Sequence, residues 1–520
     1  MQAAPCTRLP FFHGDDPLHA RRIWQAPRRS QFIVGVLLLL GFAARLRQYL
    51  AATSFWHDEA YLLLNIFNKS FADLVGPLTH EQAAPPLFLW ALRSCYVTLG
   101  SSELAMRLPA LVASLAALAL MVPLARVVCG GAYWLWALGC ACVSSCLLHL
   151  TYQVKPYSTD VLMAEAVLLA GALCLSPAAS ARARSVSRLA IVAAAVLGPW
   201  LSFPSVFVLG GACVALIATA IENRRRDDYL LAAIMPATLL ASSLLVWLAA
   251  ARHHNTPYQQ SFWAAEFMDL SSPAAAVTWL LTKLVEAGGY GVQGIGIPMA
   301  LLAAIGLASC WRRRPALSIL LTMPACLACL ASALHLYPLG NRLLAFLLPG
   351  LWLCAAQGLE TAAGHFHNRA PRLVPAIAVL LLLAGGLRTA LYSVVAKPSV
   401  EFRQAFDYVH AHWNEGDSLW VSQPEVYEAY FGHARNVIHA KSPREAVQAA
   451  ALRGRVWMVC HPPASQTTRW DPARREFADV GAVEVDRRRF VHMDLSVFAP
   501  PPLTASHSNP RSSSCRTWAD

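Results

Sequence analysis

Long apolar runs, each able to cross a lipid bilayer, are the feature that most limits how this chain can fold. A membrane-spanning helix needs about 20 predominantly apolar residues, within a range of about 17 to 25. Runs of this length recur between residues 31 and 392 and predict about eleven spans. The predicted spans cover residues 31–50, 103–125, 131–151, 159–176, 189–201, 204–221, 229–250, 294–310, 316–336, 343–362 and 373–392. The sequence therefore predicts a polytopic α-helical membrane protein.

The composition supports a lipid environment. Hydrophobic residues make up 56% of the 520 residues and charged residues only 14%, whereas charged residues reach about 25% in an ordinary soluble domain. The formal net charge is +12, but the basic residues stand in short clusters between the apolar runs. A nucleic-acid site would gather them in one patch or stripe. We therefore expect membrane lipids, and no nucleic acid, among the partners.

The stretch 189–221 is too long for one span and has to be divided. Pro199 and Pro204 stand on either side of Ser202, and a proline inside a helix removes a backbone hydrogen bond and kinks or ends the helix. We therefore predict two short helices, 189–201 and 204–221, joined as a hairpin.

Arginine and lysine are distributed unequally between the loops, and cytoplasmic loops carry the excess of these residues. One alternate set of loops is rich in arginine, while the opposite set has few cations. The rich set holds Arg21, Arg22, Arg28, Arg29, Arg126, Arg182, Arg184, Arg188, Arg224 to Arg226, Arg312 to Arg314, Arg369 and Arg372. This pattern predicts a cytoplasmic segment 1–30 and a transmembrane domain 31–397 with an outward loop 51–102. It also predicts that the C-terminal end lies on the extracytoplasmic side of the membrane.

The composition changes after Lys397-Pro398 to that of a soluble domain. An amphipathic helix pattern covers 401–409, and strand-like runs cover 418–421 and 455–459. Alternation of helix and strand predicts a small extracytoplasmic α/β domain over 398–498. The segment 499–520 is rich in proline and serine and is predicted to be a disordered tail.

An acidic pair, Asp58-Glu59, follows the first predicted span and lies in the outward loop 51–102, which also holds His80-Glu81. A carboxylate beside a bilayer is unfavourable unless it is solvated or paired, so ionisable residues at this place indicate a functional site. A solvated start of the loop is the alternative interpretation of the pair.

The predicted topology brings further charged residues to the same outward face. Arg107 opens the second span, Lys155, Tyr157 and Asp160 lie at the turn between the third and fourth, and Arg342 lies between the ninth and tenth. Structural alternatives exist for them. A long basic side chain can snorkel to the interface, Arg107 can form a structural ion pair, and Asp160 can be the first-turn acid of a helix.

At these segments the sequence resembles the GT-C superfamily of polyprenyl-phosphate-sugar-dependent glycosyltransferases. The similarity is to its bacterial branch related to protein O-mannosyltransferases and aminoarabinose transferases. It rests on Asp-Glu-Ala at 58–60, Ala-Pro-Pro-Leu at 84–87, Glu-Leu-Ala-Met-Arg-Leu-Pro at 103–109 and Lys-Pro-Tyr at 155–157. The similarity is strongest over 31–170, and Arg342 and Pro349 echo a late outward loop and helix of the family. Position 155 is a lysine, whereas an arginine is frequent there in these relatives. Lysine keeps the positive charge but lacks the two-pronged guanidinium that binds a phosphate through two hydrogen bonds.

The resemblance implies a GT-C-like fold and an enzyme of a bacterial inner membrane. Such an enzyme moves a hexosyl or pentosyl group from a polyprenyl phosphate to a lipid, glycan or protein acceptor, with inversion. Asp58 is then the expected general base and Glu59 its catalytic or positioning neighbour. The expected substrate-binding residues, with cations directed at the phosphate, are His80, Glu81, Arg107, Lys155, Tyr157, Asp160 and Arg342.

Metal ligands cannot be assembled from the sequence. A carboxylate pair can bind a divalent cation, but no third oxygen ligand is identifiable beside Asp58-Glu59, so we expect a site without a metal or other cofactor. A divalent cation stays the alternative.

A polytopic transporter or lipid flippase is the competing function class. Transporters place their ionisable groups near the bilayer midplane, in broken helices. Here the candidate site lies in outward loops, which favours the enzyme. A scaffold without catalytic activity is the third alternative. The residues do not select a particular sugar or acceptor.

Overall fold

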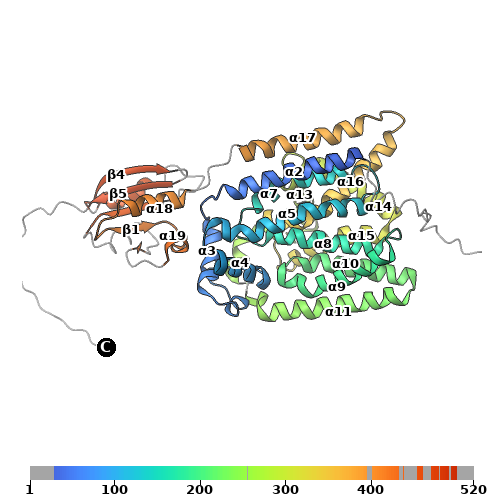
Figure 1. Ribbon diagram of the computed structural model, residues 1–520, viewed down its shortest axis with the longest axis horizontal. Coiled ribbons are helices and arrows are strands. Elements are labelled where there is room, and N and C mark those ends of the chain that lie inside the picture. The colour runs from blue at the N-terminus through green and yellow to red at the C-terminus, as the bar shows by residue number, and fades with distance from the viewer. Residues whose placement is uncertain are drawn as a thin grey trace, which may run out of the picture. The chain divides into compact units, whose positions relative to one another are not determined.

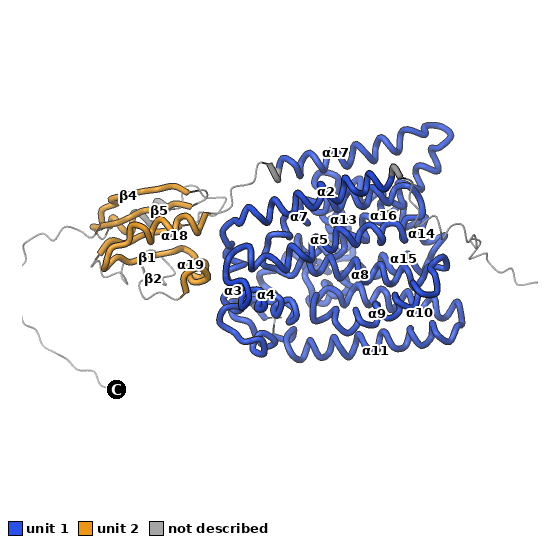
Figure 2. The backbone as a smooth tube through the Cα atoms, viewed as in Figure 1, with its two compact units in different colours: residues 1–397 blue, residues 398–520 orange. Residues whose placement is uncertain are grey.

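The computed structural model describes residues 28–253, 256–394, 401–432, 437–438, 454–460, 470–479, 481–490 and 493–499. The predicted cytoplasmic segment up to residue 27 and the predicted tail from residue 500 lie outside the described residues. The chain divides into two compact units, Met1–Lys397 and Pro398–Asp520, which Figure 2 shows in blue and orange.

The described residues of the first unit form helices joined by turns and loops, without a β-strand (Figure 1). Its elements are α2 (Arg28–Leu50), α3 (His57–Asn68), η1 (Asp73–Val75), α4 (Pro86–Leu99), α5 (Glu103–Val128), α6 (Trp134–Val143), α7 (Ser145–Leu150), α8 (Tyr157–Leu175), α9 (Ala181–Leu201), α10 (Ser205–Asn223), α11 (Arg226–Ala249), η2 (Ala251–His253), α12 (Pro257–Phe262), η3 (Ala264–Glu266), α13 (Pro273–Gly291), α14 (Gly296–Arg313), α15 (Pro315–Ala333), η4 (Asn341–Leu347), α16 (Leu348–Phe366) and α17 (Leu373–Val394).

The described residues contain nine helices that are long and apolar enough to cross a membrane. The pair α13 and α14, bent by 109°, raises the number to ten if it counts as one span. These helices confirm the polytopic α-helical class that the apolar runs predict.

The prediction of one continuous membrane-spanning helix over residues 131–151 is wrong. The structure divides it at Ser144 into α6 and α7, of 10 and 6 residues. The Ser144 hydroxyl accepts a hydrogen bond from the Leu147 backbone N–H at 3.2 Å. A serine that caps a new helix in this way competes with continuation of the preceding one.

The predicted break between 189–201 and 204–221 is confirmed, because α9 ends at Leu201 and α10 begins at Ser205. The two helices are not short, however: they have 21 and 19 residues. α9 begins at Ala181, earlier than predicted, since the Ser180 side chain accepts a hydrogen bond from Ala183 N and caps the helix. The arginines of its first turns are therefore helical rather than part of a loop.

Elements of the first outward loop are helical as well. α3 and α4 contact each other and lie at one end of the helix bundle (Figure 1). Pro86 occupies the first turn of α4, where its missing N–H leaves no backbone partner unsatisfied. The loop is therefore an ordered structure on which side chains can be held in place.

The described residues of the second unit form a five-stranded sheet in the order β2-β1-β3-β5-β4. β1 is parallel to β2 and β3, and β5 is antiparallel to β3 and β4. The described elements are α18 (Phe402–Ala411), β1 (Ser418–Val421), α19 (Pro424–Phe431), β2 (Val437–Ile438), β3 (Val456–Cys460), α21 (Trp470–Asp479), β4 (Val483–Phe490) and β5 (Met493–Ala499). The predicted helix and strands correspond to α18, β1 and β3.

Helices α14 and α16 approach each other backbone to backbone. A Cβ atom added to Gly306 would lie 1.9 Å from the Cys354 carbonyl oxygen, and one added to Gly358 would lie 2.0 Å from the Leu302 carbonyl oxygen. Small residues at helix contacts permit this kind of close packing inside membranes. Both positions therefore require glycine for steric reasons.

We predict that Gly306→Ala lowers the temperature of thermal unfolding in detergent micelles, because the new methyl group must push the two backbones apart. Gly364→Ala in α16 is the matched control, since nothing lies within 4 Å of its Cβ position. Alanine is favoured over glycine in a helix by about 1 kcal/mol, so the control should unfold at the same or a higher temperature. Equal unfolding temperatures for the two variants would contradict the close packing.

Candidate active site

A cavity of about 620 Å³ is formed where α3, the turn before α4, the start of α8, α12 and the loop before η4 come together. Seven of the nine residues predicted from the sequence line it. These are Asp58, His80, Glu81, Lys155, Tyr157, Asp160 and Arg342. Glu59 and Arg107 do not line it. Residues separated by almost 300 positions are thus brought to one site by the packing of the helices.

Asp58 lies between two cations. Its Oδ1 accepts a hydrogen bond from Lys155 Nζ at 2.9 Å, and its Oδ2 lies 2.8 Å from Arg342 Nη2. Burial raises the pKa of the Asp58 carboxyl, but the charges of Lys155 and Arg342 outweigh this effect and bring the pKa to about 2. Asp58 is therefore ionised at neutral pH in the cavity as it stands.

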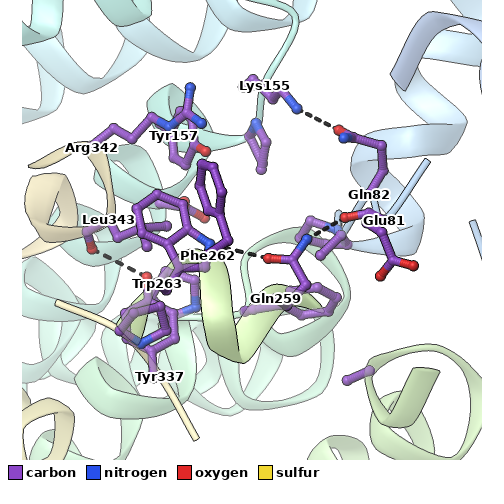
Figure 3. Close-up of a pocket in the computed structure, with 18 of the residues that line it drawn as sticks. Glu81, Gln82, Lys155, Tyr157, Gln259, Phe262, Trp263, Tyr337, Arg342 and Leu343 are labelled. Carbon is purple, nitrogen blue, oxygen red and sulfur yellow. Dashed lines mark hydrogen bonds between the residues drawn. The ribbon is translucent and has the colours of Figure 1, made fainter. Parts of the chain in front are cut away.

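Lys155 is the buried member of this group, with a side chain 8% exposed. Burial lowers the pKa of its ammonium group, while Asp58 acts in the opposite direction. Its Nζ also donates to Gln82 Oε1 at 2.6 Å (Figure 3). Gln82 was not predicted as a site residue, because an uncharged side chain in a loop gives no signal in the sequence.

Arg342 comes from the first turn of η4, and its guanidinium lies over the ring of Tyr157 at 5.3 Å from the ring centroid (Figure 3). Tyr157 is the first residue of α8, directly after the Lys155-Pro156 dipeptide. A cation above an aromatic face is attracted by the ring quadrupole. The contact fixes the direction from which Arg342 approaches Asp58.

Glu59 and Arg107 form a buried ion pair behind the cavity, with side chains 5% and 3% exposed. Arg107 Nε and Nη2 donate to the two Glu59 oxygens at 3.1 and 2.8 Å. The same carboxylate accepts from the backbone N–H groups of Trp56 at 3.0 Å and Val154 at 2.8 Å. Glu59 thus ties the start of α3 to α5 and to the residue before Lys155, which makes it a positioning residue.

Arg107 is predicted to bind a phosphate, but in the structure its side chain does not line the cavity. Besides Glu59, its guanidinium donates to the carbonyl oxygens of Thr53 at 2.6 Å and Ser54 at 3.2 Å. The structural ion pair considered for Arg107 in the sequence is the arrangement observed. Arg107 therefore orders the chain on both sides of Asp58 rather than facing the cavity.

Asp160 lies in the first turn of α8, and 6% of it is exposed. Among the described residues its Oδ1 atom has no hydrogen-bond partner. Both cations that line the cavity, Lys155 and Arg342, pair with Asp58 rather than with Asp160. Asp160 therefore contributes a carboxylate to the cavity wall with acceptor capacity to spare.

His80 and Glu81 form the turn that closes one side of the cavity. Both have left-handed backbones, with φ of 58° and 53°, which is uncommon for residues other than glycine. The turn is fastened to α12, because Thr256 Oγ1 donates to Glu81 Oε2 at 2.5 Å. The Gln259 side-chain amide also donates to the Glu81 carbonyl oxygen (Figure 3). Glu81 thus holds the loop that carries Gln82 and His80.

Several lining residues were not predicted from the sequence. Gln259, Phe262 and Trp263 come from α12 and the residue that follows it, and Tyr337 comes from the loop before η4 (Figure 3). Trp263 Nε1 donates to Gln259 Oε1 at 3.1 Å. The available signal was a cluster of aromatic residues in a polar loop, which a belt at the membrane interface produces equally well.

The described part of the chain contains no group of three or more histidine, cysteine, aspartate or glutamate side chains placed to hold a metal ion.

Comparisons with known proteins show similarity at the level of structure but not of sequence. No family model matches the sequence, and no curated protein matches it. The structure is similar to that of ArnT from Cupriavidus metallidurans bound to undecaprenyl phosphate, with a TM-score of 0.55, 13% identity, and coverage of 94% of this chain and 100% of that chain. The apo state of the same ArnT gives a TM-score of 0.53 with 13% identity, covering 90% of this chain and 97% of that chain.

An oligosaccharyltransferase of Archaeoglobus fulgidus, in complex with zinc and sulfate, aligns with a TM-score of 0.49 and 11% identity over 82% of this chain and 67% of that chain. The chain therefore shares its fold with ArnT, which agrees with the GT-C-like fold that the sequence motifs predict.

We predict that Arg107→Met lowers stability by about 3–5 kcal/mol, because it leaves the Glu59 carboxylate buried and uncompensated. The double variant Glu59→Met with Arg107→Met should lose less than the sum of the two single variants, since no charge is then left unpaired. The free energy of unfolding in detergent micelles is measured for the unsubstituted chain, the two single variants and the double variant. Additive losses would show that the two side chains are not coupled and would contradict the assigned ion pair.

Proposed function

We propose that the protein is an integral-membrane glycosyltransferase that moves a sugar from a polyprenyl-phosphate donor to an acceptor hydroxyl. One observation carries the proposal: an ionised carboxylate, Asp58, is held by Lys155 and Arg342 inside a cavity at one end of the helix bundle. The site unites a base with cations suited to a phosphate. The fold shared with ArnT, which has been crystallised with undecaprenyl phosphate, supports the same donor class.

Asp58 is the proposed general base. The acceptor oxygen attacks the anomeric carbon, its proton passes to the Asp58 carboxylate, and the bond from the anomeric carbon to the phosphate oxygen breaks. A single displacement of this kind inverts the anomeric configuration. The departing phosphate takes the bonding electrons, and Lys155 and Arg342 stabilise its growing negative charge in surroundings of low dielectric constant.

Binding of the donor improves the base in this scheme. A carboxyl with a pKa of about 2 is a weak base at neutral pH. When the donor phosphate draws Lys155 and Arg342 toward itself, Asp58 loses part of the stabilisation of its charged form, and its pKa rises toward the ordinary range. The two cations thus stabilise the free carboxylate before the phosphate arrives and the phosphate afterwards.

The remaining cavity residues are proposed to position the substrates. Asp160 and the Glu81 turn provide carboxylate and backbone acceptors for hydroxyl groups of the sugar or the acceptor. A divalent cation at Asp58 would have to displace Lys155 or Arg342, so we assign neutralisation of the phosphate to these side chains and keep a divalent cation as the alternative. Hexosyl and pentosyl donors, and lipid, glycan and protein acceptors, all agree with this chemistry.

A bacterial cytoplasmic membrane is the proposed location. The chain has an arginine-rich set of loops, which we place in the cytoplasm together with the amino terminus. The cavity and the second unit, Pro398–Asp520, then lie outside, where the donor sugar would be used.

We predict that Asp58→Asn lowers the rate of sugar transfer by about 10²- to 10⁴-fold in proteoliposomes, because the amide cannot accept the proton. Binding of undecaprenyl phosphate should persist, since Lys155 and Arg342 are kept. Asp73→Asn is the matched control, as Asp73 lies in the same outward loop but outside the cavity.

Two outcomes would contradict this assignment. Undiminished transfer by Asp58→Asn would remove Asp58 as the base. Movement of a labelled polyprenyl phosphate across the bilayer by the unsubstituted protein, without any transfer of sugar, would favour the flippase alternative.

We also predict that a membrane-impermeant maleimide labels an Asp407→Cys variant from outside intact spheroplasts, because the Asp407 side chain is 61% exposed in the second unit. Arg313→Cys, at the end of α14 in an arginine-rich loop, should be labelled only after lysis. The unsubstituted chain provides the background of native cysteines. The reverse labelling pattern would overturn the proposed orientation.

A further inference from the structure

Four aromatic rings form a continuous series along one part of the cavity lining. They belong to Trp56, His57 and Tyr61 at the start of α3 and to His80 in the turn before α4, and all four line the cavity together with Asp58. The ring centroids of Trp56 and His57 are 4.3 Å apart, those of His57 and Tyr61 5.9 Å, and those of Tyr61 and His80 5.2 Å. We call these four residues the aromatic wall.

The position of the aromatic wall is tied to that of Asp58. Trp56 and His57 directly precede Asp58, and Tyr61 follows it by three residues, which places it on the same side of α3. The rings of Tyr61 and His80 stack almost parallel, with 5° between their planes. A ligand group that rests on the wall is therefore beside the Asp58 carboxylate.

The wall is held by interactions that a packing role would not need. His80 has the left-handed backbone of a two-residue turn, and its neighbour Glu81 is fastened by Thr256 and Gln259. Strained backbone of this kind is kept where the surroundings fix it, often at functional sites. Burial lowers the pKa of the His57 imidazole, so this ring is uncharged at neutral pH and does not repel the two cations.

Neither common structural role accounts for these rings. Trp56 is 40% exposed and His80 is also exposed, so they are not core residues. Residues of an interfacial belt would face lipid, whereas these four line the cavity.

We propose that the aromatic wall binds the sugar ring of the lipid-phosphate donor. The proposal rests on the proposed function and adds the subsite for the sugar itself. A sugar ring presents a face of C–H groups with partial positive charge, and the face of an aromatic ring carries the negative part of its quadrupole. Lys155 and Arg342 supply the charge for the phosphate. The wall supplies the surfaces of aromatic rings for the sugar attached to it; the planes of Trp56 and His57 are inclined by 53° and those of His57 and Tyr61 by 78°, so the rings meet the sugar at different angles.

Two substitutions remove rings with little other change. His80→Asn keeps a residue type that tolerates the left-handed backbone, because asparagine adopts this region more readily than most residues. Tyr61→Leu removes a ring and keeps an apolar side chain, and Tyr61→Phe is its matched control, since it keeps the ring and removes only the hydroxyl group. Thermal unfolding of each variant shows whether it is folded.

The dissociation constants of undecaprenyl phosphate and of undecaprenyl phosphate carrying glucose, mannose or aminoarabinose test the proposal on the purified full chain. The unsubstituted protein should bind at least one sugar-bearing lipid more tightly than undecaprenyl phosphate. We expect His80→Asn and Tyr61→Leu to weaken binding of that lipid by about 3- to 10-fold. Tyr61→Phe should bind it like the unsubstituted protein, and undecaprenyl phosphate should bind equally to all variants.

Three results would overturn the proposal: no gain in affinity from any of the sugars, an unchanged gain in both ring-deleting variants, or an equal loss of both kinds of lipid. The proposed function fails separately. Asp58→Asn should keep the gain in affinity from the sugar while losing transfer. If the unsubstituted protein transfers sugar and both ring-deleting variants do so with an unchanged KM for the donor, the wall is not the sugar subsite although the enzyme class stands.

Discussion

The buried ion pair between Glu59 and Arg107 is the interaction on which the site depends. It joins the start of α3 to α5, and the same carboxylate accepts the backbone N–H of Val154, the residue before Lys155. Asp58 and Lys155 are the chain neighbours of these anchored positions, so their 2.9 Å contact follows from the anchoring. A buried carboxylate needs paired charge and hydrogen bonds, and Glu59 receives both from segments that must meet for the cavity to form.

The charges that face the cavity are arranged differently from the pair behind it. Asp58 has two cationic neighbours, and one side of the cavity consists of aromatic rings. Around Asp58 the two cations outnumber the single carboxylate, and they attract a phosphate strongly because little water screens charges beside a region of low dielectric constant. The cations leave Asp58 ionised when no phosphate is present. In the proposed mechanism, the same two side chains therefore bind the lipid phosphate and activate the base.

The sequence motifs predicted most of the residues of this site, because each motif is a short continuous stretch of the chain. Asp58 and Glu59 adjoin a span end, and Lys155-Pro156-Tyr157 forms the entry to α8, so hydropathy and charge suffice to bring them to one face of the membrane. Gln82, Gln259 and Phe262 could not be found in this way. Their contribution depends on how the turn at His80 and Glu81 meets α12, and contacts between loops leave no periodic pattern in either segment.

By itself, the sequence determined the membrane-spanning helices, the break at Ser202 and the place of the acidic pair just after the first of these helices, because apolar run length and proline act locally. Only the tertiary structure decided which acid faces the cavity and which is buried. Adjacent residues on a helix point about 100° apart, so Asp58 and Glu59 face different directions. The packing of α5 against the start of α3 gives Glu59 the partner Arg107 and leaves Asp58 to Lys155 and Arg342.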